Sequence, residues 1–188
     1  MIKVGITGSL ASGKTTASKI LSKNRGPLFS ADVVVKKLYR DKKFKNLVSK
    51  KFGIRNDNHI KKNIKKLIFE NTLNLRKLEK LIHPLVREEM KRFTYRNKNN
   101  KLIFYEIPLL IESKLMKFFN VIIFVKSNKE LRLRRFKSRG GKKYFFNLLN
   151  SKQISEREKI KLCDYVVVNE KNLMILKKNL FTIISKYE

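Results

Sequence analysis

Cysteine and histidine are scarce in this chain of 188 residues. Its one cysteine, Cys163, cannot form an internal disulfide, and with only two histidines there is no Cys/His spacing that suggests zinc. No stretch approaches the roughly 20 apolar residues of a membrane-spanning helix, so no membrane association is expected. The first apolar run begins at residue 2 and leaves no room for a signal or transit peptide. Together these absences predict a cytoplasmic protein.

Acidic residues are also few. The 15 Asp and Glu residues stand against 46 Lys and Arg, which gives a formal net charge of +31. Such a surplus is compatible with nucleic-acid binding. However, the lysines are spread along the whole chain, and Lys, Asn, Ile and Phe are all abundant, as AT-biased genomes produce. We therefore interpret the charge mainly as compositional bias and expect no specific nucleic-acid partner, although a cationic surface favours anionic small substrates.

Two of the seven glycines lie in the stretch Gly8-Ser9-Leu10-Ala11-Ser12-Gly13-Lys14-Thr15, which matches G-x-x-x-x-G-K-[ST] at every fixed position. Backbone N–H groups of such a loop, and of the helix after it, bind phosphates. We expect Lys14 to be exposed and to reach the terminal phosphates, while the Thr15 hydroxyl suits Mg²⁺. An apolar run at 2–6 and helical spacing at 17–21 supply the strand and helix that the motif requires. The predicted nucleotide-binding residues are Gly8, Ala11, Ser12, Gly13, Lys14, Thr15 and Thr16.

Strands and helices alternate through the rest of the chain. Near-continuous apolar strands are typical of a buried parallel sheet. The pattern therefore predicts an α/β fold in one domain, residues 1–188, with a five-stranded parallel sheet and helices on both faces. The further predicted strands are 28–29, 102–105, 121–125 and 165–168, and the further predicted helices lie within 33–52, 54–72, 75–83, 84–93, 131–139 and 173–184.

Two segments of the predicted domain stand apart. Residues 54–98 are helical and have the size of an inserted substrate-binding lobe, in which Pro84 predicts that one helix ends near His83 and another begins there. Residues 139–155 follow a strongly basic helix and begin with Arg139-Gly140-Gly141. A cationic segment hinged on glycines beside a phosphate site indicates a mobile lid that carries phosphate-binding arginines.

Acidic residues follow two of the predicted strands. Asp32 is either a ligand-binding carboxylate at the sheet edge or the N-cap of the next helix, and the two roles are compatible. Glu106 either orients Mg²⁺ through water, or caps a helix or pairs with a neighbouring lysine. A lone histidine such as His83 is by default a packed or capping residue.

Six motifs follow one another in a family-specific order: Ile6-Thr7-Gly8 with Ser12-Gly13-Lys14-Thr15, Ala31-Asp32, Leu81-Ile82-His83-Pro84-Leu85, Pro108-Leu109-Leu110-Ile111-Glu112, Gln153 through Lys159, and Cys163-Asp164-Tyr165-Val166 with Asn169. With these motifs the sequence resembles the dephospho-coenzyme A kinase family over essentially its whole length. Four positions depart from the family's usual pattern: Ser9 and Ala11 replace glycines, Ser30 replaces an aspartate, and Ser155 replaces a frequent proline.

The resemblance implies a P-loop NTPase fold of three layers and ATP-dependent phosphorylation of the ribose 3′-hydroxyl of dephospho-coenzyme A, the last step of coenzyme A synthesis. ATP and Mg²⁺ are the implied cofactors, with Thr15 as metal ligand. The implied catalytic residues are Lys14, Asp32 and Arg139, with Arg135 as a weaker helper. Expected substrate contacts are Thr7, Asp32, His83 and Arg87. We expect a monomer or a weak homo-oligomer.

Two other functions stay open at this point. One is a small-molecule kinase of similar build that acts on a nucleoside or nucleotide. The other is a nucleic-acid-binding P-loop protein, for which stacking aromatics among basic residues are typical. Tyr144, Phe145 and Phe146 beside Lys142 and Lys143 form the one such cluster, and we interpret it as lid packing.

Overall fold

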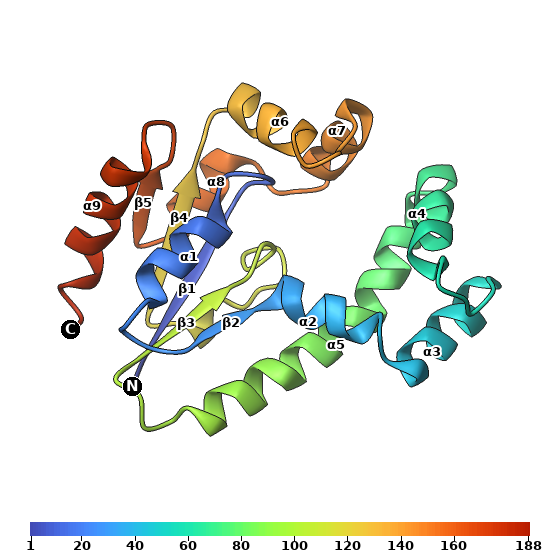
Figure 1. Cartoon of the computed structure of the whole chain (residues 1–188), viewed down its shortest axis with the longest axis horizontal. Helices are drawn as coiled ribbons and strands as arrows, with labels where there is room; N and C mark the ends of the chain where they lie inside the picture. The colour runs from blue at the N-terminus through green and yellow to red at the C-terminus, as the bar shows by residue number, and fades with distance from the viewer. The chain divides into compact units, whose positions relative to one another are not determined.

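The computed structural model describes residues 1–188, which form two compact units (Figure 1). The first, here called the sheet unit, comprises residues 1–30 and 97–188. The second, the helical unit, comprises residues 31–96. The helical unit thus begins before residue 54, where the sequence predicted the start of a substrate lobe. That a lobe at 54–98 binds substrate stays a prediction.

The sheet unit contains five parallel strands in the order β2-β3-β1-β4-β5. This confirms the predicted five-stranded parallel sheet. In a parallel sheet the carboxyl ends of all strands meet at one edge, which is where ligands bind in α/β folds. The strands are β1 (Ile2–Gly8), β2 (Leu28–Ser30), β3 (Leu102–Glu106), β4 (Val121–Lys126) and β5 (Tyr165–Val168).

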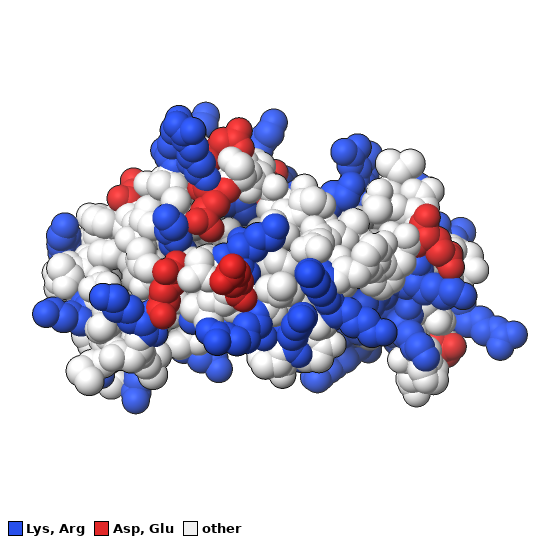
Figure 2. Space-filling model, turned by 90° about the horizontal axis from the view of Figure 1, so that it is seen from above, with Lys and Arg blue, Asp and Glu red and all other residues white.

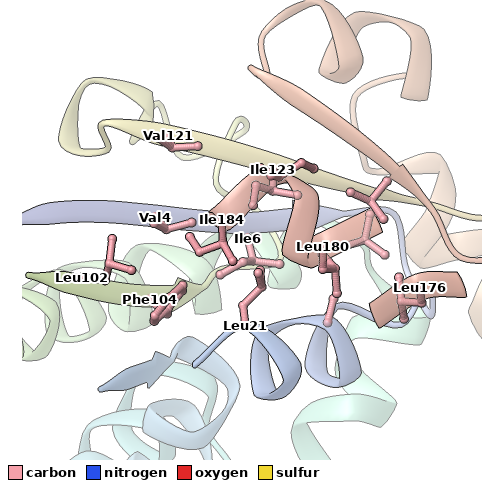
Figure 3. Packing of buried hydrophobic residues seen from close by; sticks show 14 residues of the cluster. Val4, Ile6, Leu21, Leu102, Phe104, Val121, Ile123, Leu176, Leu180 and Ile184 are labelled. Atoms are coloured by element: carbon pink, nitrogen blue, oxygen red, sulfur yellow. The ribbon is translucent and has the colours of Figure 1, made fainter. Parts of the chain in front are cut away.

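The core of the sheet unit lies between the sheet and two helices, α1 (Lys14–Ser22) and α9 (Leu173–Ile184). Leu21 of α1 and Leu180 of α9 point toward the same face of the strands (Figure 3). Both are fully buried, and burying such a side chain contributes about 1.5–3 kcal/mol. On the opposite face, the Tyr105 ring contacts the rings of Phe118 and Phe119, so an aromatic cluster covers that side.

The remaining helices of the sheet unit lie between β3 and β5 in sequence. They are η1 (Met116–Phe118), α6 (Lys129–Lys137), α7 (Lys143–Ser151) and α8 (Glu156–Lys161). The segment 139–155, predicted as a lid, therefore contains a formed helix. Phe146 of α7 is fully buried and its ring packs against Phe136 of α6, which agrees with the interpretation of this aromatic cluster as packing. Movement of the segment stays a prediction.

The helical unit has its own small core. Its helices are α2 (Ala31–Leu38), α3 (Lys42–Phe52), α4 (Ile60–Glu70) and α5 (Leu73–Arg96). One helix was predicted over 33–52, and the structure has two. The break occurs because the Asp41 side chain accepts a hydrogen bond from the Phe44 N–H at 2.7 Å and so caps α3. The buried core residues are Phe44, Val48, Ile60, Ile64, Ile68 and Leu78.

The predicted helix break at Pro84 is wrong, because α5 runs through it without interruption. A proline inside a helix removes one backbone hydrogen bond and costs about 3 kcal/mol. Apolar side chains on both sides of Pro84, including Leu78 before it and Leu85 after it, pack into the core of the helical unit. Their burial holds the two halves in one helix.

Lys and Arg side chains are scattered over the visible face of the molecule, with few Asp and Glu side chains among them (Figure 2). They do not gather into one stripe on that face. None of the helices has the length and apolar character needed to cross a bilayer.

Candidate functional site

The phosphate loop, residues 8–15, joins β1 to α1 and requires glycine at two positions. Gly8 has φ +152°, and a Cβ there would lie 2.4 Å from the Val125 carbonyl oxygen. Gly13 has φ +98°, and a Cβ there would lie 2.1 Å from the Asn169 amide nitrogen. Ala11 adopts φ +60°, a left-handed conformation that costs a residue with a Cβ about 1–2 kcal/mol. Position 11 is one of the two loop positions that we expected to be glycine from the family resemblance.

The Lys14 side chain lies inside the phosphate loop. Its Nζ donates to the carbonyl oxygens of Gly8 at 3.1 Å and Ser9 at 2.9 Å. Only 8% of the residue is exposed, so the prediction of an exposed lysine is wrong. The loop backbone wraps around the ammonium group and covers it. A positive charge is thus held at the N-terminus of α1, where the helix dipole already favours an anion.

A buried carboxylate lies beside the start of α1. Glu106 ends β3 and is only 2% exposed. The Thr15 hydroxyl donates to Glu106 Oε1, and the Ser30 hydroxyl donates to Oε2 at 3.1 Å. Two hydroxyl groups, and not a lysine or a helix end, therefore hold Glu106. A hydroxyl and a carboxylate are hard oxygen donors, so this pair fits Mg²⁺ chemically.

Hydrogen bonds join the outer side of the phosphate loop to the segment from α6 to α8. Arg132 Nη1 donates to the Leu10 carbonyl at 3.2 Å, and the Leu10 N–H donates to Gln153 Oε1 at 3.3 Å. The Ser9 hydroxyl donates to Glu156 Oε2 at 3.1 Å. Arg132 is 6% exposed. Burial lowers its pKa and the nearby Glu156 raises it, and an arginine stays protonated in either case.

A second set of hydrogen bonds holds the loop backbone at Ser12. Its carbonyl oxygen accepts from Asn169 Nδ2 at 2.8 Å and from Arg135 Nη1 at 3.2 Å. Arg135 Nη2 also donates to the Asn169 carbonyl at 3.0 Å. Burial lowers the pKa of Arg135, and the neighbouring charge of Arg139 lowers it further. Arg135, predicted as a weak catalytic helper, thus contacts the loop backbone directly.

Three other predicted residues belong to the sheet unit. Thr7 is fully buried and its hydroxyl donates to the Pro108 carbonyl at 3.3 Å. Thr16 is exposed in the first turn of α1. Arg139 is exposed just after α6, beyond the turn that contains Arg135. The roles predicted for Thr7, Thr16 and Arg139 stay predictions.

Three predicted residues belong to the helical unit. Asp32 lies within the first turn of α2, after Ala31, so its interpretation as an N-cap is wrong. A carboxylate there is favoured by the helix dipole. His83 and Arg87 are one turn apart on α5, on the same side of the helix. The pKa of His83 is lowered first by burial; Glu79 raises it and Arg87 lowers it. The lowered pKa favours the neutral form of the His83 imidazole.

Sequence patterns gave no role to Arg132, Gln153, Glu156 or Asn169 in holding the loop. For only one of them did the sequence contain a pattern that could have predicted a place near the loop. Asn169 directly follows β5, and a polar residue after a parallel strand lies at the ligand-binding edge of the sheet. Arg132 and Glu156 lie on helices α6 and α8, and Gln153 lies in the connection between α7 and α8; no short sequence pattern specifies which way these segments pack.

Comparisons with known proteins agree with the geometry. The model of the family described as dephospho-CoA kinase matches residues 2–174. The chain is 33% identical over 189 residues to the dephospho-CoA kinase of Rickettsia bellii, covering 100% of this chain and 98% of that protein. This chain belongs to the dephospho-CoA kinase family. It is accordingly a kinase and a transferase, and the family implies the use of ATP.

Solved structures support the same fold for this chain. A Thermus thermophilus crystal structure has a TM-score of 0.79 at 27% identity, with 98% of this chain and 97% of that chain covered. Dephospho-CoA kinase from Campylobacter jejuni has a TM-score of 0.65 at 22% identity, with 99% and 97% covered. The fold is therefore that of P-loop kinases, as predicted.

Proposed function

We propose that this chain transfers the γ-phosphoryl group of ATP to the ribose 3′-hydroxyl of dephospho-coenzyme A, giving coenzyme A and ADP. The observation that carries the proposal is a complete phosphate loop with a buried lysine, in a chain that belongs to the dephospho-CoA kinase family over residues 2–174. In this reaction the 3′-oxygen forms a bond to the γ-phosphorus while the bond to the β–γ bridging oxygen breaks. The hydroxyl proton leaves and ADP departs.

Phosphoryl transfer depends mostly on positioning and on charge stabilisation. The backbone N–H groups of the loop and the N-terminus of α1 supply fixed positive dipoles for the β- and γ-phosphates. Lys14 adds a full charge at the same place, and its bonds to the Gly8 and Ser9 carbonyls keep the ammonium group directed into the loop. We assign Lys14 to the stabilisation of charge on the transferring oxygens.

Thr15 and Glu106 would hold Mg²⁺, Thr15 directly and Glu106 directly or through water. The ion supplies charge neutralisation for the β- and γ-phosphate oxygens when it is bound. The hydrogen bond between the Thr15 hydroxyl and the buried Glu106 carboxylate supports this assignment, because it fixes two hard oxygen donors side by side. Ser30, bonded to the other Glu106 oxygen, keeps the carboxylate in its orientation.

Asp32 is our candidate for the general base. It follows Ser30 by two residues and lies in the first turn of α2, so the chain itself keeps it close to the carboxyl end of β2. Its carboxylate would orient the 3′-hydroxyl and accept its proton. His83 and Arg87, one turn apart on α5, are proposed contacts to the acceptor, with Thr7 assisting near the loop. Arg139 would neutralise charge on the transferring group from the segment after α6.

The proposal is tested by measuring ADP release with a panel of acceptors. We expect rapid release with dephospho-coenzyme A and slow release with adenosine, with AMP and with water alone. A nucleoside or nucleotide that outcompetes dephospho-coenzyme A would instead indicate another small-molecule kinase. Omission of Mg²⁺, or excess chelator, should abolish release if Thr15 and Glu106 hold the ion.

A further inference from the structure

Side chains outside the phosphate loop donate hydrogen bonds to two of its carbonyl groups, those of Leu10 and Ser12. Arg132 donates to the carbonyl of Leu10, and Arg135 donates to the carbonyl of Ser12. The two arginines are three residues apart on α6 and therefore lie on the same side of that helix. Asn169 adds a second donor to the Ser12 carbonyl at 2.8 Å. A helix and the end of a strand thus fix the direction of two loop peptides.

The direction of a carbonyl decides the direction of the N–H that follows it. All peptide bonds in this chain are trans, and in a trans peptide the C=O and the next N–H point in opposite directions. With the Ser12 oxygen held toward Asn169 and Arg135, the Gly13 N–H points away from them. With the Leu10 oxygen held toward Arg132, the Ala11 N–H likewise points away from α6.

We propose that Asn169 and Arg135 are positioning residues that hold the Ser12–Gly13 peptide so that the Gly13 N–H donates to a nucleotide phosphate. Neither side chain would touch the phosphate in this arrangement. Arg132 acts in the same way on the Leu10–Ala11 peptide. The inference rests on the proposed function only in that the loop binds a nucleoside di- or triphosphate.

The arginine and the asparagine are themselves held in place. Arg135 Nη1 also donates to the Ser127 hydroxyl at 3.2 Å, and that hydroxyl donates to the Asn169 carbonyl at 3.1 Å. Arg135 Nη2 donates to the same carbonyl at 3.0 Å. Ser127 and Asn169 are almost fully buried. The Ser12 carbonyl, the Ser127 hydroxyl and the Asn169 carbonyl thus surround the Arg135 guanidinium group. They direct it at these protein groups and not at the transferring phosphate.

The same arrangement explains why a larger residue is excluded at position 13. The Asn169 amide nitrogen would lie 2.1 Å from a Cβ there, so the amide packs directly on the Gly13 backbone. Gly13 also has φ +98°, which residues with side chains rarely adopt. The Asn169 amide can therefore reach the Ser12 carbonyl only when residue 13 has no side chain.

The test compares the binding of ADP and adenosine to Asn169→Ala by isothermal titration calorimetry. Loss of the Ser12 hydrogen bond should weaken ADP binding by about tenfold. Adenosine has no phosphate, so its affinity should stay within about twofold of the parent value. Asn169→Asp, which puts an acceptor where the amide donates, should weaken ADP binding at least as much. Arg135→Ala should behave like Asn169→Ala, and the double variant should lose less than the product of the two effects.

Asn172→Ala is the matched control. Asn172 lies three residues further on and caps α9 by accepting from the Ile175 N–H at 3.0 Å. Its loss should lower the melting temperature without changing the ratio of ADP to adenosine affinity. Equal weakening of ADP and adenosine in Asn169→Ala would overturn the proposal, because it would place Asn169 against the nucleoside. Unchanged ADP affinity in a folded Asn169→Ala would also overturn it. Neither result depends on which acceptor the enzyme phosphorylates.

Discussion

A buried ion pair joins Lys159 in α8 to Glu112, which follows β3, and replacing Lys159 by methionine would break it. Lys159 is fully buried, and its Nζ lies 2.5 Å from Glu112 Oε1. The same Nζ donates to Gln153 Oε1 at 3.4 Å, and Gln153 in turn accepts from the Leu10 N–H of the phosphate loop. Methionine has a similar length and no charge, so the substitution removes the cation while filling most of the space.

The loss of stability in Lys159→Met depends on which contacts the Glu112 carboxylate keeps. Its Oε1 would keep the Ile154 N–H at 3.3 Å, while its Oε2 is buried and makes no hydrogen bond. Removing one partner of a buried pair typically costs about 3–5 kcal/mol. The Glu112 side chain is 16% exposed, and this contact with water favours the lower end, about 3 kcal/mol. For a chain of this size that corresponds to a fall in Tm of about 6–12 °C.

Thermal unfolding followed by circular dichroism measures this directly. Glu112→Gln combined with Lys159→Met removes both charges and should recover most of the lost stability, because an uncharged pair leaves no buried ion. Lys161→Met, at an exposed position of the same helix, is the control and should melt like the parent. A Lys159→Met variant that melts within about 2 °C of the parent, or a double variant that melts as low as the single one, would refute the reasoning.

Three further predictions concern Asp32, Ala11 and the net charge of the chain. Asp32→Asn should keep ATP binding but lower kcat at least about a hundredfold, because an amide cannot accept the hydroxyl proton; turnover within a few-fold of the parent would leave Asp32 as a first-turn carboxylate only. Ala11→Gly should raise the free energy of unfolding by about 0.5–1 kcal/mol, measured by urea denaturation, because glycine adopts φ +60° without strain; a destabilised variant would contradict this. RNA binding measured by fluorescence anisotropy should be weak, independent of sequence and lost by roughly 0.2 M salt; tight sequence-specific binding above that salt would favour a nucleic-acid partner.

The strand, loop and helix at the N-terminus were predictable because every requirement of the motif is local. Gly8 and Gly13 mark the turns, and alternation of apolar runs with helical periodicity predicts the parallel sheet. The exposure of Lys14 was predicted wrongly for a physical reason. Sequence shows that the lysine follows a glycine-rich loop, but not that the loop backbone closes around the ammonium group.

The partners of the loop could not be predicted in the same way. Arg132 and Arg135 belong to a helix in which several arginines alternate, and only the packing of α6 decides which of them contact the loop. The continuity of α5 through Pro84 similarly depends on burial of side chains on both sides of the proline. Local propensity favoured a break there, and tertiary packing overrode it.

The central claim is tested most directly by identifying the product formed from ATP, Mg²⁺ and dephospho-coenzyme A. Phosphorus NMR should show a new monoester phosphate at the ribose 3′ position, with one ADP formed for each coenzyme A. Lys14→Ala, verified as folded by circular dichroism because the lysine is buried, should reduce product formation by orders of magnitude. Phosphate on a different atom of the acceptor, or near-normal product from the Lys14→Ala variant, would contradict the account.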